Sequence, residues 1–236
     1  MASMMDDTIN ELEGLLGHNF QDKPLLTLAC THRSFRHENP AITGDNERLE
    51  FIGDAALGLI VADILYRRYP DKHEGELSSV RSQLIRGEIC QKFTHKLGLE
   101  KFLLLGKGEK ENNQRAHGRL MANFFEAILG ALYLDGGLPV VSTFFYTHFE
   151  EEIASHALSP EPNWKSLIQE YSQKTRKVYP TYELKEQTGP GHLRQFTVDL
   201  LVGDEVWGTG IASSKKEAEM VAARAAARRQ GISGGK

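Results

Sequence analysis

The stretch NERLEFIGDAALGLIVADIL, residues 46–65, has the apolar character of a helix that packs inside a protein core. Three acidic residues nevertheless stand near its start: Glu47, Glu50 and Asp54. Their spacing places them in one row along a helix. The sequence therefore raises the question of why an apolar helix carries a row of carboxylates.

A second apolar stretch repeats this pattern. NFFEAILGALYL, residues 123–134, contains Glu126 as its only charged residue, and Asn123 lies one turn earlier on the same helical face. Burying unpaired carboxylates is costly, and neither helix supplies basic residues at the matching spacing. A divalent cation would remove both the burial cost and the mutual repulsion, and all-oxygen ligands favour Mg²⁺ or Mn²⁺. The alternative is that these side chains are ordinary solvated residues on helix faces.

Composition limits the class of protein. The chain has 236 residues, of which 40% are hydrophobic, so it can bury a substantial core. Its two cysteines, Cys30 and Cys90, lack metal-like spacing and suit a reducing compartment. The N-terminal segment is acidic, and no uninterrupted apolar run approaches the ~20 residues of a membrane span. We therefore expect a cytoplasmic protein with no membrane partner.

Charge is distributed unevenly along the chain. The net charge is −4, but residues 1–160 contain 16 Lys and Arg against 23 Asp and Glu, whereas residues 161–236 contain 12 against 9. The two parts thus carry −7 and +3. An anionic partner is expected to bind the second part.

The pattern of residues predicts two domains of different class. Residues 1–154 show helical spacing throughout and predict an all-α domain. Residues 155–162, with two prolines and small polar residues, are typical of a linker. Residues 163–231 predict a small α+β domain of order α-β-β-β-α, and residues 232–236 a tail.

Two lysines mark the start of the last predicted helix. In SSKKEAE, Lys215 and Lys216 follow a serine cap, where the helix dipole disfavours positive charge by about 0.3–1 kcal/mol each. Their position favours docking of an anion such as phosphate. A plain solvated surface is the alternative.

Several motifs resemble the bacterial ribonuclease III family of double-strand-specific RNA endonucleases. The longest is NERLEFIGDAAL, residues 46–57, and the others occur in the family's order: LACTHRSF, GELSSVRSQLI, LGKGE and EAILGALYLDGG. The resemblance extends from about Leu12 to Gly231. It implies an all-α ribonuclease III endonuclease domain followed by a double-stranded RNA-binding domain.

The resemblance also implies a chemistry. Family members use Mg²⁺ to hydrolyse duplex RNA to 5′-phosphate and 3′-hydroxyl ends, and they process structured precursors such as rRNA. The positions matching the metal ligands are Glu50, Asp54, Asn123 and Glu126. Glu47, Asp54 and Glu126 match catalytic carboxylates.

Two positions have particular implications. Family members are homodimers in which an aromatic residue matching Phe51 inserts into the partner, whereas core packing would be the plain interpretation of Phe51. Asn123 stands where the family usually has Asp, so the cluster loses one negative charge. The alternative function is therefore a duplex-RNA binder whose cleavage is impaired by Asn123.

The C-terminal segment resembles a double-stranded RNA-binding domain, which reads A-form shape over ~16 base pairs. The resemblance implies RNA contacts from the first helix, from the GPGH loop and from the start of the last helix. One further position, Glu219, is acidic where some members carry a third basic residue. The matching residues are Ser166, Gln169, Glu170, Gln173, His192, Lys215 and Lys216.

Overall fold

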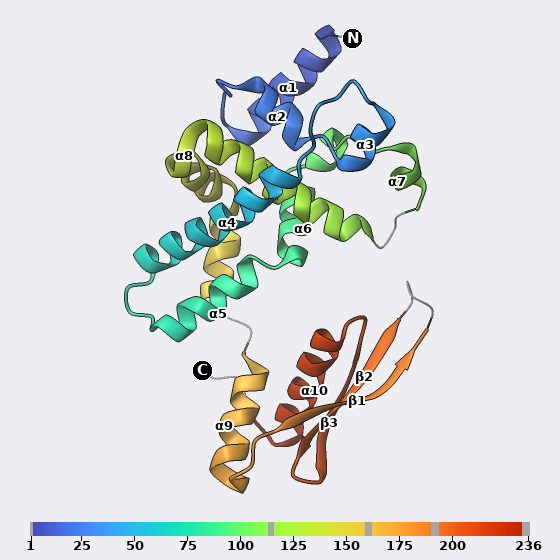
Figure 1. The fold of residues 1–236 in the computed structure, drawn as a ribbon. Helices are drawn as coiled ribbons and strands as arrows, with labels where there is room; N and C mark the ends of the chain where they lie inside the picture. Colours follow the sequence, from blue (N-terminus) through green and yellow to red (C-terminus); the bar gives the residue numbers. More distant parts are fainter. Residues whose placement is uncertain (1, 113–115, 159–161, 190–193, 233–236) are drawn as a thin grey trace. The chain divides into compact units, whose positions relative to one another are not determined.

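The chain folds into two compact units, residues 1–160 and 161–236. A computed structural model describes residues 2–112, 116–158, 162–189 and 194–232 (Figure 1). The described part of the first unit is helical, with one isolated parallel bridge between Thr31 and Leu104. Its elements are α1 (Ala2–Leu16), α2 (Lys23–Ala29), α3 (Arg33–Glu38), α4 (Glu47–Arg68), α5 (Glu74–Leu84), α6 (Gly87–Lys96), a 3-10 helix η1 (Leu99–Phe102), α7 (Lys107–Asn112) and α8 (Ala116–Leu158).

Helices α4 and α8 form the centre of the first unit and lie side by side (Figure 1). Glycines allow their backbones to approach closely. A Cβ on Gly53 of α4 would lie 1.7 Å from the carbonyl oxygen of Glu126, and one on Gly130 of α8 would lie 2.2 Å from that of Leu49. The apolar stretches around the acidic residues are therefore held against each other, backbone to backbone.

The core between α6 and α8 is aromatic. Phe93 of α6 stacks on Phe149, with ring centroids 3.9 Å apart, and Phe125 packs edge-on against Phe145 at 6.2 Å. These rings are buried almost completely. Such large buried side chains contribute heavily to the stability of the unit.

Helix α8 is interrupted at Gly136–Gly137, a pair of glycines that is typical of a helix end. Gly137 has φ +70° and ψ −174°, which interrupts the helix just before Pro139. By length and composition alone, Gly118–Leu158 could cross a membrane, a test that core helices of folded domains also pass. Here Phe124 and Phe125 lie in the hydrophobic core of the first unit.

Some helix boundaries in the first unit agree with the sequence pattern and others do not. The stretch around Val80 to Leu97 shows one helical periodicity, but the structure divides it into α5 and α6, because Ile85 and Arg86 leave helical geometry. Gly98 follows the last apolar residue of this stretch, a position typical of a helix stop, and it adopts φ +63° just after α6 ends. The α8 helix continues to Leu158, so residues 155–158 of the predicted linker are helical.

The second unit has the predicted order of elements: α9 (Trp164–Arg176), β1 (Thr181–Thr188), β2 (Gln195–Val202), β3 (Glu205–Ala212) and α10 (Lys215–Arg229). The strands form an antiparallel sheet of order β1-β2-β3. Val198, Leu200 and Val202 alternate into the core, as their spacing predicts.

Helix α10 lies very close to β3. A Cβ on Gly208 would lie 2.4 Å from the carbonyl oxygen of Ala222, and one on Gly210 would lie 2.1 Å from that of Ala218. Ser214 caps the helix, accepting a hydrogen bond from the Glu217 N–H at 3.2 Å. The start of α10, with its two lysines, is thus fixed against the sheet.

Candidate functional site

The crossing of α4 and α8 brings the predicted carboxylates together. Glu50 and Asp54 lie on α4, and Asn123 and Glu126 lie on α8. Glu50, Asn123 and Glu126 are half-buried, whereas Asp54 is exposed. The expectation that the apolar helices bury these carboxylates therefore holds for Glu50 and Glu126 but is wrong for Asp54.

The electrostatics of the site reflect this crowding. Burial raises the pKa of Glu126 to about 7, and the negative charges of Asp54 and Glu50 add to the shift. Burial also raises the pKa of Glu50, and the negative charge of Glu47 adds to this shift. A hydrogen bond from the side chain of Asn123 and the charge of Arg119 lower the same pKa, but each by less than burial raises it. The carboxylates of Glu50, Asp54 and Glu126 therefore lie within range of one another's charge.

The start of α4 is held by buried hydrogen bonds. Asn46 is 3% exposed, and its amide donates to the carbonyl of Ala29 at 3.1 Å while its N–H donates to that of Thr31 at 2.9 Å. The Glu47 N–H donates to the Asp45 carboxylate at 3.2 Å. These contacts fix where the row of carboxylates begins.

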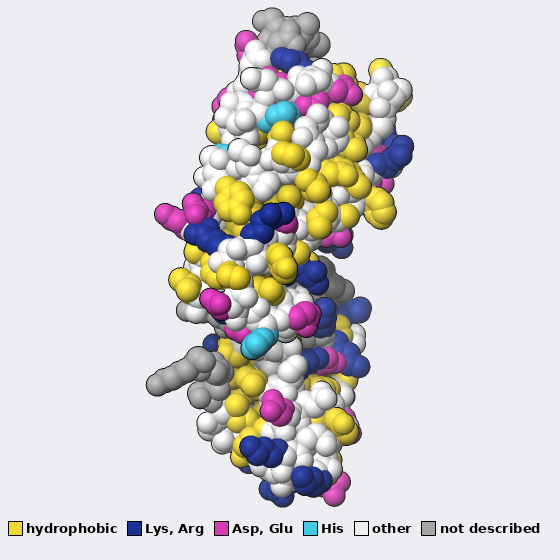
Figure 2. Space-filling view, turned by 90° about the vertical axis from the view of Figure 1, so that its left-hand side faces the viewer, with side chains coloured by type: hydrophobic (Ala, Val, Ile, Leu, Met, Phe, Trp, Pro, Cys, Tyr) yellow, Lys and Arg dark blue, Asp and Glu magenta, His cyan; other side chains and the backbone are white. Residues whose placement is uncertain are grey.

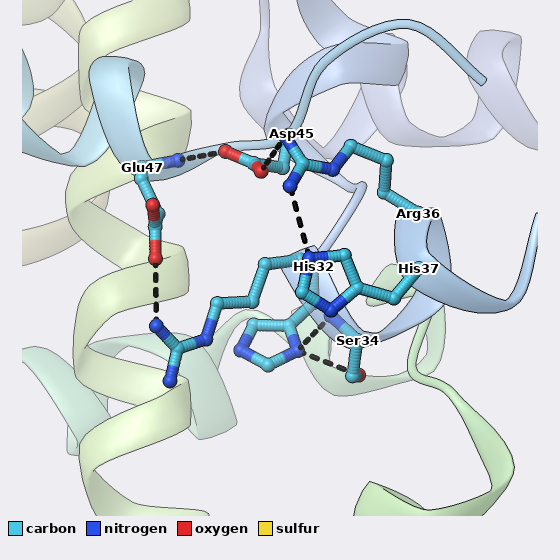
Figure 3. Close-up of polar contacts among 7 residues, drawn as sticks. His32, Ser34, Arg36, His37, Asp45 and Glu47 are labelled. Atoms are coloured by element: carbon cyan, nitrogen blue, oxygen red, sulfur yellow. Dashed lines mark hydrogen bonds and ion pairs between the residues drawn. The ribbon is translucent and has the colours of Figure 1, made fainter. Parts of the chain in front are cut away.

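Figure 3 shows how α3 faces this point. Arg33 donates to the carboxylate of Glu47 at 3.2 Å, and Arg36 pairs with Asp45 at 2.9 Å. The side chain of His32 caps α3 by accepting a hydrogen bond from the Ser34 N–H at 3.2 Å. Glu47 therefore has a basic partner, which comes from α3 and not from either of the two carboxylate-bearing helices.

A cavity of about 490 Å³ opens beside these residues. It is lined from α4 by Glu47 and Glu50, from α8 by Arg119 and Asn123, and from α3 by Arg33. Arg119 precedes Asn123 by four residues on α8 and shares its helical face, so the prediction that neither helix supplies a basic residue at the matching spacing is wrong for α8. Arg33 could not be identified from sequence spacing, since Glu47, its partner, lies in a different helix.

The donor set suits a hard divalent cation. Glu50, Asp54 and Glu126 offer carboxylate oxygens, and Asn123 offers an amide oxygen. Among the described residues, however, no three His, Cys, Asp or Glu side chains already converge at metal-binding distance. The unrelieved crowding around Glu126 is what a bound cation would offset.

The second unit presents most of its predicted RNA-contacting side chains outward. On α9, Ser166, Gln169 and Glu170 are exposed and Gln173 is half-buried. Lys215 and Lys216 are exposed at the start of α10. The remaining prediction, His192, lies outside the described residues.

Glu219 has a partner within the second unit. Its carboxylate pairs with Lys165 of α9 at 2.5 Å, and the same ammonium lies 4.6 Å from the centre of the Tyr182 ring. Glu219 therefore joins α10 to α9 at the position where some family members carry a third basic residue.

Phe51 is 79% exposed in the single chain, so the core-packing interpretation is wrong. Leu59 and Tyr66 are also exposed on the same side of α4. Figure 2 shows hydrophobic side chains gathered over one face of the first unit. Hydrophobic side chains gathered on one face in this way mark an interaction surface.

Comparison with known proteins agrees with this architecture. Residues 22–153 match the profile described as Ribonuclease-III-like, and residues 164–229 match the double-stranded RNA binding motif. Ribonuclease 3 of Protochlamydia amoebophila is 42% identical over 90% of this chain and 88% of its own length. Ribonuclease 3 of Bdellovibrio bacteriovorus is 40% identical over 94% of this chain and 95% of its own length.

A solved structure matches the first unit. The nuclease domain of ribonuclease III from Campylobacter jejuni, described for flexibility in a region involved in dimer formation, is 34% identical, with a TM-score of 0.54. The match covers 60% of this chain and 99% of that domain. With a helical nuclease unit, an α-β-β-β-α unit and these relatives, the chain belongs to the ribonuclease III family and is a ribonuclease III-type endoribonuclease with a double-stranded RNA-binding domain.

Proposed function

We propose that this protein is a Mg²⁺-dependent endonuclease that hydrolyses phosphodiesters of double-stranded RNA to 5′-phosphate and 3′-hydroxyl ends. It acts in the cytoplasm on structured precursors such as rRNA, and Mn²⁺ can substitute for Mg²⁺. The observation that carries the proposal is the crowding of Glu126 by Asp54 and Glu50 across the α4–α8 crossing, beside an open cavity.

Four side chains would hold the metal: Glu50, Asp54, Asn123 and Glu126. Bound divalent cations supply charge that polarises the phosphoryl group and lowers the pKa of water. The backbone contact at Gly53 keeps the two carboxylate-bearing helices at a fixed separation. Glu47, paired with Arg33 at the rim of the cavity, is a further carboxylate beside the scissile phosphate.

We also propose that the protein works as a homodimer joined through the exposed face of α4. Phe51 stands out from that face, and a groove of about 580 Å³ between α4 and α5, lined by Leu59, Tyr66 and Leu77, offers an apolar surface nearby. A two-fold dimer would present one carboxylate cluster to each RNA strand. The family relative described for its dimer-forming region supports this arrangement.

A second candidate function is binding of duplex RNA without efficient cleavage. Asn123 brings no charge, and its amide donates a hydrogen bond to Glu50. This hydrogen bond competes with a metal ion for the carboxylate of Glu50. Lower metal affinity would follow, because each lost carboxylate removes attraction for the cation.

The deciding experiment is cleavage of a labelled RNA duplex in Mg²⁺ by the parent and by Asn123→Asp, with RNA binding measured in parallel. Cutting by both proteins supports the endonuclease proposal. Cutting by the Asp form alone, with equal binding, supports the binder. If neither protein cuts under conditions where both bind, the proposed cleavage function is refuted.

A further inference from the structure

The cavity beside the carboxylates has a guanidinium on each of two sides. Arg33 enters from α3 and Arg119 from the first turn of α8, so residues far apart in sequence meet at one opening. Glu47, Glu50 and Glu109 line the same cavity, and the charge of Arg119 acts on Glu50. A wall that contains both acidic and basic side chains is unlike the purely acidic wall that metal binding alone would require.

Both guanidinium groups are available to a ligand. The side chain of Arg33 is 63% exposed, and that of its partner Glu47 is 55% exposed. An ion pair this exposed contributes little to folding and exchanges readily with solvent. Arg119 is exposed and has no hydrogen bond or ion pair with any residue in the described parts of the chain.

The ligand that fits is a phosphodiester. A guanidinium presents paired N–H donors that match phosphate oxygens, whereas carboxylates beside it repel the same group unless a cation is present. The amide at Asn123 weakens that repulsion on the α8 side, since it replaces a charge within the same cavity wall. The cavity thus combines oxygen donors for a cation with nitrogen donors for an anion.

We propose that Arg33 and Arg119 are substrate-binding residues of the cleavage site, each contacting a backbone phosphate of the RNA strand that enters this cavity. This inference rests on the proposed function, because it requires duplex RNA to lie along the first unit. It assigns to the nuclease unit a phosphate grip separate from that of Lys215 and Lys216 in the second unit.

The test uses the full chain with Ca²⁺ in place of Mg²⁺, so that a cation offsets the charge of the carboxylates while this larger, less polarising ion leaves the duplex uncut. Fluorescence titration would compare a duplex with ordinary phosphates against one whose central linkages carry neutral methylphosphonates in both strands. The parent should favour the phosphate duplex, and Arg33→Ala or Arg119→Ala should reduce that preference about three- to tenfold. Arg119→Lys should retain part of it.

Arg68→Ala is the matched control, because Arg68 is a part-exposed arginine of the same unit that also pairs with a glutamate, Glu150, at 2.8 Å. It should keep the parental preference. If both cavity variants also keep it, the proposal is overturned. This outcome can be separated from cleavage. If the parent never cuts in Mg²⁺, the endonuclease function is refuted. If Arg33→Ala and Arg119→Ala nevertheless lose the preference for the phosphate duplex, the phosphate grip is supported.

Discussion

Gly53 of α4 rests against the backbone of Glu126 on α8, so closely that a Cβ atom at residue 53 would lie 1.7 Å from the Glu126 carbonyl oxygen. Gly53 immediately precedes Asp54, so the contact point of the two helices coincides with the carboxylates that they carry. The geometry of the candidate metal site is therefore set by a residue without a side chain.

Gly53→Ala should destabilise the nuclease unit by about 3 kcal/mol, because the new methyl group meets backbone that cannot move aside. Thermal unfolding followed by circular dichroism would measure the loss. Gly14→Ala on α1 is the control: nothing lies within 4 Å of its prospective Cβ, and alanine favours helix by about 1 kcal/mol. Equal stability of the two variants would contradict the close contact.

Glu126→Gln should abolish cleavage while leaving RNA affinity nearly unchanged, because residue 126 belongs to the nuclease unit, whereas Lys215 and Lys216 belong to the second unit. Gel-shift and cleavage assays on one duplex would measure both. Glu151→Gln, an exposed residue of the same helix, should cut like the parent. Parental cutting by Glu126→Gln would remove this residue from the site.

The same variant has a pH signature in chelator. Folding raises the pKa of Glu126 from 4.5 to about 7. Below pH 4.5 this carboxyl therefore does not lower the free energy of unfolding, and above pH 7 it lowers it to the full extent. Glu126→Gln should therefore unfold at a higher temperature than the parent at pH 8, with the difference shrinking toward pH 4.5. A lower unfolding temperature at pH 8 would mean that the charge is already compensated.

Lys215→Ala combined with Lys216→Ala should weaken RNA binding and reduce its dependence on salt. Each phosphate contact adds about 0.7–0.9 to the slope of log affinity against log salt concentration, so the double variant should lose up to about 2. Titrations at several salt concentrations would give the slope. The control, Arg224→Ala with Arg228→Ala, removes the same charge further along α10 and should change the slope less. If the parent and the lysine variant have equal slopes, Lys215 and Lys216 do not contact phosphate.

Phe51→Ala should shift the protein from dimer to monomer, because the most exposed aromatic side chain of α4 would no longer bury its ring against a partner. Light scattering coupled to size exclusion would report the mass. Tyr179→Ala, which removes an aromatic residue 63% exposed in the second unit, should stay dimeric. A Phe51→Ala protein of dimeric mass would refute the proposed interface.

Much of the architecture could be predicted from sequence because local patterns decide it. Alternation in residues 195–202 is enough for a half-buried strand, and Ser214 and Gly98 occupy positions that begin and end helices. The proximity of Glu50 and Glu126 could also be predicted from the sequence, since each carboxylate interrupts an otherwise apolar helix.

Other features depend on which surfaces meet, and sequence periodicity does not contain that information. Asp54 follows the helical row of Glu47 and Glu50 but faces solvent in the single chain, because α8 covers only part of α4. Arg33 reaches Glu47 only after the loop between α3 and α4 folds back. The break between α5 and α6 leaves the apolar periodicity intact, so that pattern alone does not reveal it.

The glycines of β3 have a consequence for the order in which the protein melts. Because α10 approaches the sheet through Gly208, Gly210 and alanines, the second unit buries few large side chains besides Trp207 and Ile168. The first unit instead contains a cluster of stacked phenylalanine rings and a far larger core. Small domains bury less surface per residue and are correspondingly marginal. On warming, the protein should lose the contribution of its second unit to RNA binding while the nuclease unit is still folded, which makes substrate capture the heat-sensitive step of its activity.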